Sequence, residues 1–367
     1  MGLRPRALEA VGMTSDLAIY AGRRVLVTGH TGFKGSWLCR WLERLGATVA
    51  GYSLPPPSSP SHHQLLAPAY RQWTADVRDG EALAAACAEF RPEIVFHLAA
   101  QALVRASYRE PVATLETNVT GTANLLEACR RTDSVRAAVV VTTDKCYRNR
   151  EWLWAYREND ELGGHDPYSA SKACAELVVA SYRDSFLRER GVLVASARAG
   201  NVIGGGDWAA DRLIPDLVRA AVADEPLVVR NPQATRPWQH VLEPLAGYLL
   251  LGGQLLAGRS EFAEAWNFGP DPAANLAVAE MVTAMAAHWP ALRCQTPTLA
   301  GQPHEAGLLM LDSTKARRLL SWQPVWGVAE TLARTADWYR AHYEQDRVLT
   351  DRQIDAYGAG LAAGAGA

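Results

Sequence analysis

The chain has 367 residues, and its 37 Lys and Arg nearly balance its 39 Asp and Glu, which leaves a formal net charge of −2. A protein that binds nucleic acid through the phosphates normally carries a basic excess, so this balance argues against nucleic acid as the main partner. Hydrophobic residues make up 49% and charged residues 21% of the chain, which is typical of a globular protein of one large or two smaller domains.

No apolar run reaches the roughly 18 to 20 residues that a membrane-spanning helix needs, so we expect no membrane partner. The N-terminal segment mixes charged with apolar residues and does not resemble a secretory signal, and Met13 is an alternative start. The six cysteines form no C-x-x-C pair, which argues against a zinc site or a disulfide framework. We therefore expect a cytoplasmic protein with reduced thiols and no metal.

From residue 23 onward, short β-branched runs alternate with longer helical patterns, which is typical of βαβ units around a parallel sheet. The predicted strands are Arg24–Thr28, Thr48–Tyr52, Gln72–Ala75, Ile94–Leu98, Ala137–Thr142 and Leu193–Ala199. The predicted helices are Ser36–Leu45, Gly80–Phe90, Val112–Arg130 and Pro167–Arg188. Because the strands are apolar on both faces, the pattern predicts the α/β class, with a doubly wound parallel Rossmann sheet covered on both sides.

Beyond about residue 200 the alternation weakens, which predicts a smaller C-terminal substrate-binding lobe. The expected division is an N-terminal extension (1–21), a cofactor domain (22–200) to which later parts of the chain return, the substrate lobe (201–345) and a tail (346–367). The proline-rich connection Ser53–Tyr70 is interpreted as a stiff surface loop, although loops of this length are often functional. The tail from Gly358 onward is expected to be disordered, and Trp322 and Trp338 are expected in the core.

A glycine loop joins the first predicted strand to the first predicted helix. It reads Gly29-His30-Thr31-Gly32-Phe33-Lys34-Gly35. Glycines at this spacing allow a tight turn and let backbone N–H groups approach a pyrophosphate, while the helix N-terminus favours the anion. Because the motif lies between a strand and a helix, it predicts a dinucleotide cofactor. The expected contacts in the loop are Gly29, Thr31, Gly32, Phe33, Lys34 and Gly35.

The choice between NAD and NADP is not settled by the neighbouring residues. The second predicted strand is followed neither by the carboxylate that usually binds the ribose 2′-hydroxyl nor by an arginine for a 2′-phosphate. His30 and Lys34 could lie near the adenosine side. Asp76 and Val77 could hold the adenine, and the alternative for them is a helix cap followed by a core valine.

Tyr168 and Lys172 lie four residues apart on one face of a predicted helix that begins at Asp166-Pro167. A phenol with an unperturbed pKa of about 10 is a weak base, but a nearby ammonium and a helix N-terminus favour the phenolate. Beside a nicotinamide ring, such a tyrosine can take the proton of a substrate hydroxyl as hydride leaves the carbon.

Thr143, Asp144 and Lys145 follow the fifth predicted strand, at the sheet edge where ligands bind in parallel sheets. We expect them to lie opposite Tyr168. Because Tyr168, Lys172 and Thr143 suffice for hydride transfer, the additional carboxyl and amine indicate a further proton-transfer step. The alternative is a capping aspartate and a solvated lysine.

These segments resemble the extended short-chain dehydrogenase/reductase superfamily, and within it the nucleotide-sugar 4,6-dehydratases, most closely the branch that acts on CDP-glucose. The resemblance covers about Gly22–Tyr339 and is carried by Thr28–Trp37, His97–Gln101, Thr143–Tyr147, Asp166–Ser169, Arg198–Trp208, Arg212–Asp216 and Arg236–Val241. It implies NAD as the cofactor and adds Ala99, Ala100, Gln101 and Asn118 to its contacts.

The resemblance implies an internal redox elimination in deoxysugar biosynthesis. Tyr168 would remove the proton of the sugar 4-hydroxyl, held by Thr143, while hydride passes from C4 to NAD. Asp144 would protonate the departing 6-hydroxyl, and hydride would return to C6 to give CDP-4-keto-6-deoxyglucose. Most 4,6-dehydratases use a glutamate as the C5 base, whereas this chain, like the CDP-glucose branch, has Lys145. As a base, this lysine needs a lowered pKa.

The substrate lobe is expected to hold CDP-glucose. Arg212, Arg236 and His304 are candidates for the pyrophosphate, because guanidinium and imidazolium groups match phosphate oxygens. Asn201 is added because it resembles the family's substrate-contacting residue. A surface salt bridge is the alternative for Arg236, and a solvated loop is the alternative for His304. The family pairs the helices that correspond to Val112–Arg130 and Pro167–Arg188 across a two-fold axis, which implies a homodimer.

Three other functions stay open, and the first is a 4,6-dehydratase that acts on another nucleotide sugar. A nucleotide-sugar 4-epimerase shares the glycine loop and the Tyr168–Lys172 pair but needs no acid at a 6-hydroxyl, so Asp144 with Lys145 argues against it. A non-catalytic NAD(P)-sensing regulator on the same fold typically loses the tyrosine and lysine, and this chain keeps both.

Overall fold

The computed structural model describes residues 15–229, 232–233, 235–271, 274–295 and 309–364. A seven-stranded sheet forms its centre, with the order β11-β6-β5-β4-β1-β2-β3 and every pair parallel. The strands are β1 Arg24–Thr28, β2 Thr48–Ser53, β3 Arg71–Thr74, β4 Ile94–His97, β5 Ala137–Val141, β6 Leu193–Ala199 and β11 Ala265–Phe268. All six predicted strands are confirmed within two residues at each end, and β11 was not predicted.

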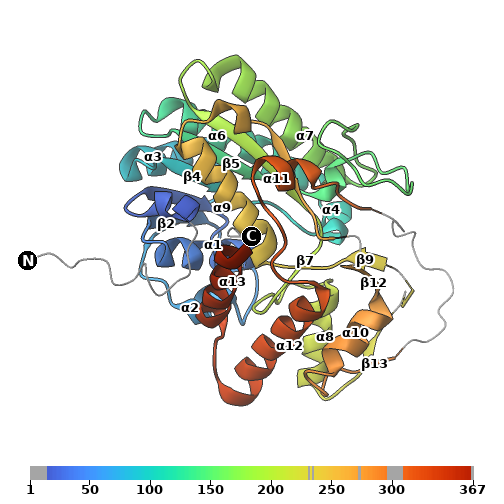
Figure 1. Cartoon of the computed structure of the whole chain (residues 1–367). Helices are drawn as coiled ribbons and strands as arrows, with labels where there is room; N and C mark the ends of the chain where they lie inside the picture. The colour runs from blue at the N-terminus through green and yellow to red at the C-terminus, as the bar shows by residue number, and fades with distance from the viewer. Residues whose placement is uncertain (1–14, 230–231, 234, 272–273, 296–308, 365–367) are drawn as a thin grey trace, which may run out of the picture.

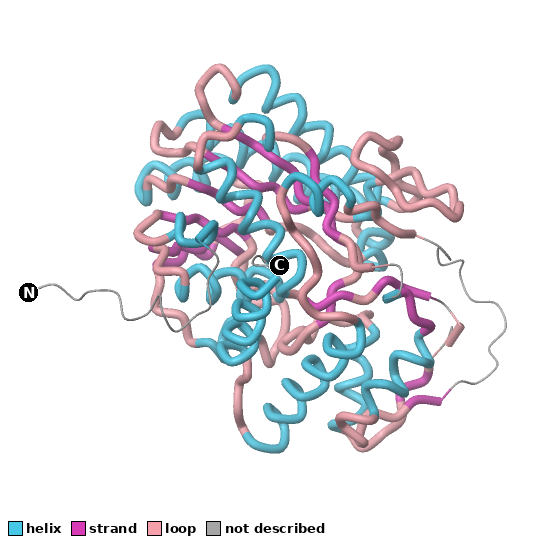
Figure 2. Tube along the Cα trace, viewed as in Figure 1, coloured by secondary structure: helices cyan, strands magenta, loops and turns pink. Residues whose placement is uncertain are grey.

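Helices cover both faces of this sheet (Figures 1 and 2). One face packs against α3 (Gly80–Phe90), α6 (Gly121–Arg131) and α7 (Pro167–Tyr182), and the other against α1 (Phe33–Arg44) and α9 (Leu242–Leu256). Alternate residues of β1 enter the two cores: Val25 and Val27 face α1 and α9, and Leu26 faces the opposite layer. The predicted doubly wound α/β class is confirmed.

The two longest predicted helices each contain a π-helical segment. The first consists of α5 (Pro111–Leu115), a π segment at Glu116–Thr120 and then α6. The second is α7, followed by a π segment at Arg183–Leu187. Asp166 caps α7 by accepting a hydrogen bond from the Ser169 backbone N–H at 3.0 Å, and Pro167 occupies the first turn.

Three helices lie below the sheet in Figure 1: α8 Leu213–Val222, α10 Val278–Ala286 and α12 Val328–Gln345. The shorter helices α2 His62–Leu66, α4 Val104–Arg109 and α11 Thr314–Leu319 pack against α1, α7 and β11, and 3-10 turns lie at Asp144–Cys146 and Ser260–Phe262. The short strand pairs are β7 Val202–Ile203 with β10 Gln239–His240, β8 Leu227–Val228 with β13 Cys294–Gln295, and β9 Thr235–Pro237 with β12 Asn275–Ala277. α9 and β11, both beyond residue 200, belong to the sheet layers.

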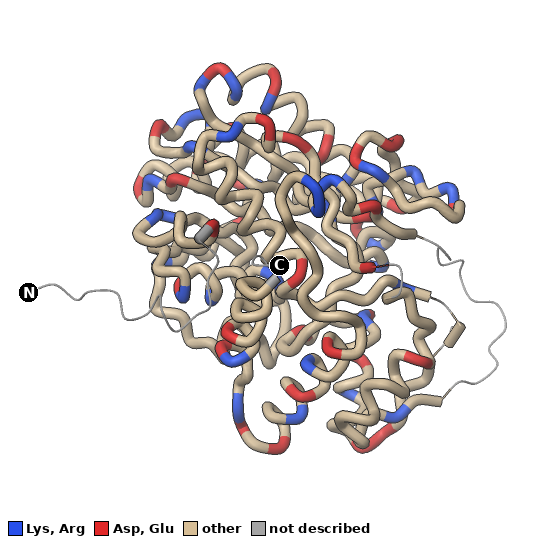
Figure 3. Tube along the Cα trace, in the orientation of Figure 1, with Lys and Arg blue, Asp and Glu red and all other residues tan. Residues whose placement is uncertain are grey.

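Charges and thiols are spread over the molecule. Basic and acidic residues are mixed along the trace (Figure 3). All six cysteines are free, and four of them are buried. No helix within the described residues is long and apolar enough to cross a membrane. Trp322 and Trp338 are fully buried, which confirms their expected place in the core. The proline-rich connection is exposed at Leu54 but buried at His62, so it is more than a surface loop.

Both described ends of the chain are packed, which corrects the prediction of a disordered tail. A 3-10 turn at Ser15–Tyr20 buries Tyr20, whose hydroxyl donates to the Leu249 carbonyl at 2.6 Å. At the other end α13, Thr350–Gly364, buries Ile354 and Tyr357 completely. Gly360 allows this close approach, because a Cβ there would lie 2.5 Å from a Val325 methyl. Met13 and residues 365–367 lie outside the described part.

The docking of α13 predicts a large stability effect for a residue near the C-terminus. Tyr357→Ala should lower the free energy of unfolding by about 3–5 kcal/mol, because it opens a cavity and removes the hydroxyl that donates to Glu243 at 2.6 Å. Leu319→Ala, at a side chain that is 60% exposed, is the control and should change it by less than about 0.5 kcal/mol. Chemical denaturation measures both values, and equal stability of the two variants would contradict the docking.

Candidate active site

A cleft of about 1860 Å³ opens at the carboxyl ends of the sheet strands. It lies where the strand order reverses between β1 and β4, which is the usual ligand position in open parallel sheets. The glycine loop and the segments that follow β4, β5 and β6 form one wall, together with the start of α7. Residues of β9 and its neighbours reach the cleft from the smaller part, including Arg236 and Trp238.

The glycine loop has the shape that a pyrophosphate needs. Gly29 has a positive φ of 74°, and a Cβ there would lie 2.6 Å from the Ala99 backbone nitrogen. A Cβ on Gly35 would lie 2.1 Å from the Gly29 carbonyl oxygen. Thr31 fixes the loop to β2, since its hydroxyl donates to the Leu54 carbonyl at 2.9 Å. The loop therefore leaves the N-terminus of α1 facing the cleft, where it fits a dinucleotide.

His30 does not lie on the adenosine side, which corrects that expectation. Its ring is 2% exposed, bonds to Gln72 at 3.0 Å and packs 5.1 Å from the ring of His63. Burial lowers the pKa of His30 to about 4. This histidine is therefore a neutral core residue at neutral pH.

Lys34 also departs from the expected position, because it lies at the catalytic end of the cleft. Its ammonium is 6.0 Å from the ring centroid of Tyr248, and its charged neighbours are Arg212, Asp144 and Lys172. Burial, Arg212 and Lys172 lower the pKa of Lys34 to about 7, against the opposing effect of Asp144. The sequence around Lys34 gave no signal of this placement.

Asp76 and Val77 line the cleft at the end of β3, as expected of residues that hold an adenine. Arg78 donates to the Asp76 carboxylate through its backbone N–H at 2.9 Å and its guanidinium at 2.7 Å, and these bonds lower the pKa of Asp76. Val77 packs on Gly121, where a Cβ would lie 2.8 Å from its methyl group. Of the alternative reading, the core valine is confirmed, because Val77 is buried, but the helix cap is wrong, since Asp79 and not Asp76 caps α3. The adenine contact stays a prediction.

The segment after β4 forms the next part of the wall, with Ala99, Ala100 and Gln101 lining the cleft. Asn118, which was also expected to contact the cofactor, lies behind this wall instead of lining the cleft and is 1% exposed. Its side chain accepts from the Gln101 backbone N–H at 2.9 Å, and donates to the Gln101 carbonyl at 3.0 Å and to the Ser171 hydroxyl at 2.8 Å. Asn118 thus ties this wall of the cleft to α7.

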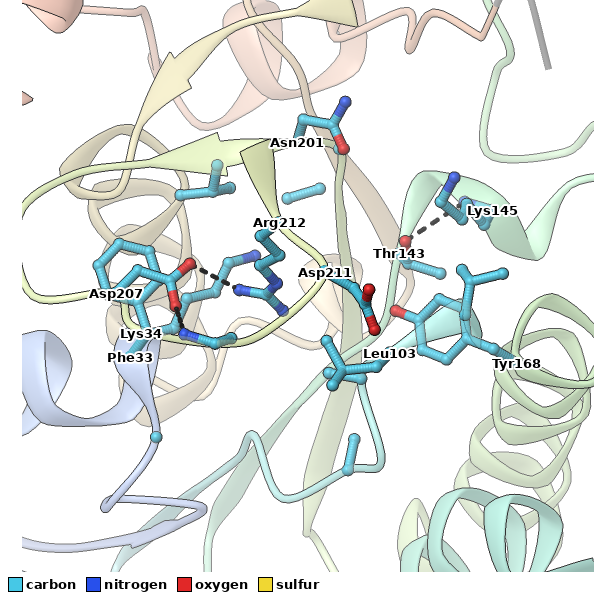
Figure 4. Close-up of a pocket in the computed structure, with 18 of the residues that line it drawn as sticks. Phe33, Lys34, Leu103, Thr143, Lys145, Tyr168, Asn201, Asp207, Asp211 and Arg212 are labelled. Carbon is cyan, nitrogen blue, oxygen red and sulfur yellow. Dashed lines mark hydrogen bonds and ion pairs between the residues drawn. The ribbon is translucent and has the colours of Figure 1, made fainter. Parts of the chain in front are cut away.

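The structure brings the predicted catalytic residues together. The Thr143 hydroxyl donates to the Asp144 carboxylate at 2.9 Å and interacts with the Tyr168 phenol. Lys172 donates from its ammonium to the Val141 carbonyl at 3.2 Å. Figure 4 shows Thr143, Lys145 and Tyr168 on one side of the cleft, facing Lys34 and Arg212 on the other.

Burial has the largest effect on the pKa values of these catalytic side chains. It raises the pKa of Tyr168 to about 12, against the hydrogen bond from Thr143, and it lowers the pKa of Lys172 to about 8. It also raises the pKa of Asp144, although Lys145, Thr143 and Lys34 oppose this. A Cβ on Gly200 would lie 2.8 Å from an Asp144 carboxylate oxygen, so the acid occupies space that only a glycine leaves free.

The expected substrate residues lie at the far side of the cleft. Arg212 pairs with Asp207 at 2.9 Å, and Asn201 and Arg236 also line the cleft. His304 lies outside the described residues. Tyr248 was missed, because it stands in a uniformly apolar stretch: it is fully buried beside Tyr168 and Asp144, and its hydroxyl has no hydrogen-bond partner in the described part of the chain.

Comparisons with known proteins agree with this geometry. The model of the NAD dependent epimerase/dehydratase family matches residues 25–263. A CDP-glucose 4,6-dehydratase of Salmonella typhimurium is 47% identical over 351 residues, covering 93% of this chain and 98% of the relative. A dTDP-glucose 4,6-dehydratase of Xanthomonas campestris is 26% identical and covers 72% and 77% of the two chains.

Solved structures show the same fold with the cofactor in place. A dTDP-glucose 4,6-dehydratase of Streptomyces venezuelae with NAD bound is 28% identical, with a TM-score of 0.73 over 88% of this chain and 98% of that one. A UDP-glucose 4-epimerase of Thermus thermophilus with NAD is 26% identical, with a TM-score of 0.74 over 86% and 99%. The chain belongs to the NAD dependent epimerase/dehydratase family and uses NAD as its cofactor.

Proposed function

We propose that this chain is a CDP-glucose 4,6-dehydratase, a hydro-lyase that converts CDP-D-glucose to CDP-4-keto-6-deoxy-D-glucose and water. The proposal rests on the buried acid Asp144, which lies between Thr143 and Lys145 in the chain and near the Tyr168–Lys172 pair. A redox reaction alone needs no such acid. The relative from Salmonella supports CDP-glucose as the substrate.

In the redox steps, Tyr168 takes the proton of the sugar 4-hydroxyl. Bound at the glycine loop, NAD would supply the acceptor for the C4 hydride and the donor for the C6 hydride. Thr143 holds the 4-hydroxyl, and the Lys172 ammonium, one turn after Tyr168 on α7, favours the phenolate. Burial makes the free phenol a weaker acid, so Lys172 and Thr143 must both compensate in the complex.

In the elimination step, the ketone at C4 acidifies the C5 proton, and Lys145 removes it. Asp144 donates its proton to the departing 6-hydroxyl, which leaves as water. Burial prepares Asp144 for this role, because a carboxyl with a raised pKa keeps its proton closer to neutral pH. The same arrangement argues against a 4-epimerase, which has no leaving hydroxyl to protonate.

We assign the binding of the CDP group to the segment 201–345, with Arg212 and Arg236 on the pyrophosphate and Asn201 near the sugar. His304 is proposed with them on the family resemblance alone. The cofactor contacts are proposed at the glycine loop, Asp76–Val77 and the wall after β4, since these residues line one continuous cleft. Free thiols at all six cysteines support a cytoplasmic location.

A homodimer is proposed through the helices on one side of the sheet. Large apolar side chains are exposed on the adjacent helices α4, α5 and α7 and in the π segment after α7: Tyr108 at 61%, Val112 at 66%, Leu177 at 59% and Phe186 at 47%. Such a gathering of exposed apolar groups on neighbouring helices marks an interaction surface. The two-fold pairing known for the family would cover it.

The dimer makes a testable prediction. Light scattering at micromolar concentration should give twice the mass of the 39.9 kDa chain. Val112→Glu with Leu177→Glu should give the monomer mass, because buried charges oppose the association. Leu319→Glu, at an exposed site on α11, is the control and should remain dimeric. A monomeric wild type would contradict the proposal.

The substrate is tested by incubation with CDP-glucose, dTDP-glucose, UDP-glucose and GDP-mannose, followed by the alkaline ultraviolet absorbance of a 4-keto sugar. CDP-glucose should give the largest kcat/KM, and Tyr168→Phe should lower kcat by about 10²–10⁴-fold. Turnover of another nucleotide sugar without CDP-glucose would overturn the substrate. No turnover of any of them would favour the NAD-sensing regulator.

The role of Lys145 is tested by turnover in deuterium oxide. Lys145→Ala should slow the entry of solvent deuterium at C5 by about 100-fold or more, because it removes the base. Asp144→Asn is the matched contrast: it removes the acid but keeps the base, so C5 exchange should continue while loss of water slows. Exchange at the wild-type rate in Lys145→Ala would refute the assignment.

A further inference from the structure

One buried carboxylate beside the catalytic residues has no part in the reaction described above. Glu176 lies on α7 one turn after Lys172 and is 4% exposed. It accepts hydrogen bonds from the Thr142 hydroxyl at 2.5 Å, the Ser196 hydroxyl at 2.6 Å and the Arg198 guanidinium at 2.8 Å. Groups from the end of β5 and from β6 thus converge on one anion of α7.

These partners keep Glu176 ionised. Burial by itself raises its pKa, but Arg198 and the two hydroxyls outweigh burial, so the pKa of Glu176 lies below its usual value. The Arg198 and Glu176 side chains are 4% and 3% exposed. A buried ion pair costs much free energy to desolvate and seldom stabilises a fold more than an apolar pair would. Stability alone is therefore a weak reason for this pair.

The charge of Glu176 acts on Lys172. The ammonium of Lys172 is held by the Val141 carbonyl at the end of β5. Burial lowers the pKa of Lys172 to about 8, and Glu176 is the largest influence that opposes it. An ammonium that loses its proton near pH 8 depends on such an anion to stay charged.

The other described groups near Lys172 do not supply the negative charge that Glu176 provides. The titratable and charged groups that face Lys172 or Glu176 from neighbouring elements are Cys146, His97, Lys34 and Arg198. Burial raises the pKa of Cys146 well above its usual value and lowers that of His97 to about 3, so both are uncharged at neutral pH. Lys34 and Arg198 are basic. Among the described groups that act on Lys172, Glu176 is thus the carboxylate that supports its charge.

We propose that Glu176 is a positioning residue that acts through Lys172, holding it as an ammonium at neutral pH so that Tyr168 can work as the base. The inference rests on the proposed function, in which Tyr168 takes the proton of the 4-hydroxyl. It adds a fixed anion behind the catalytic pair, anchored by β5 and β6, that sets the upper pH limit of activity.

The test is the pH profile of kcat/KM for CDP-glucose, which reports groups of the free enzyme. Activity should fall on the alkaline side as Lys172 loses its proton. In Glu176→Gln this fall should move to lower pH by about one unit, because an anion beside the ammonium is gone. Glu176→Asp keeps the charge and should restore the position of the alkaline limb, even if its kcat is reduced.

The expected shift separates this role from a structural one, since lost packing lowers kcat or stability without moving the limb. An alkaline limb at the wild-type pH in folded Glu176→Gln overturns the inference. If that variant does not fold because Arg198 is left unpaired, Glu176→Gln with Arg198→Gln removes both charges and is judged by the same criterion. If the wild type is active and the alkaline limb of Glu176→Gln does not move, only this inference is refuted. If the wild type is inactive with CDP-glucose, the proposed function is refuted as well.

Discussion

The site depends on the burial of one carboxyl, that of Asp144 just past the end of β5. At 6% exposure it has little access to water, and burial raises its pKa. The surrounding chain makes room for it, because Gly200 has no side chain where a Cβ would touch the carboxylate. Thr143 hydrogen bonds to it, and Lys34 and Lys145 lie near enough to moderate its pKa. An acid so placed is suited to donate a proton to a leaving hydroxyl.

Two buried carboxyls within this region have opposite protonation preferences because their partners differ. Asp144 has one hydroxyl bond and a raised pKa, whereas Glu176 has a guanidinium, two hydroxyls and a lowered pKa. Environments that push the pKa values of neighbouring acids apart are how one site combines a proton donor with a fixed anion. In the proposed reaction, Glu176 would support the redox pair on α7, and Asp144 would support the elimination.

Much of this could be predicted from the sequence, because the determining signals are local. Strand periodicity predicts six strands of the sheet, the glycine loop predicts the cofactor wall, and Asp166-Pro167 predicts the start of the helix that carries Tyr168. The carboxyl ends of parallel strands meet at one edge, so Thr143 could be placed opposite Tyr168 in advance.

The features that escaped prediction depend on tertiary contacts. β11 is short and enters the sheet from beyond residue 200. The C-terminal helix has a weakly apolar sequence, and it is ordered by Tyr357 and by the close approach of Gly360 to Val325. His30 and Lys34 belong to the same glycine motif but lie in different surroundings: Lys34 is near the catalytic acid, and His30 is in the core. Glu176 gave no signal, because its partners on β5 and β6 are distant in sequence.

In the proposed reaction, one sugar is oxidised at C4 and reduced at C6 by the same hydride, and Asp144 and Lys145 remove water between the two steps. The most direct measurement is conversion of CDP-glucose labelled with deuterium at C4, followed by NMR of the product. Deuterium should appear in the C6 methyl group, with no crossover into unlabelled substrate added to the same reaction. Deuterium that stays at C4, or that is lost to solvent, would contradict it.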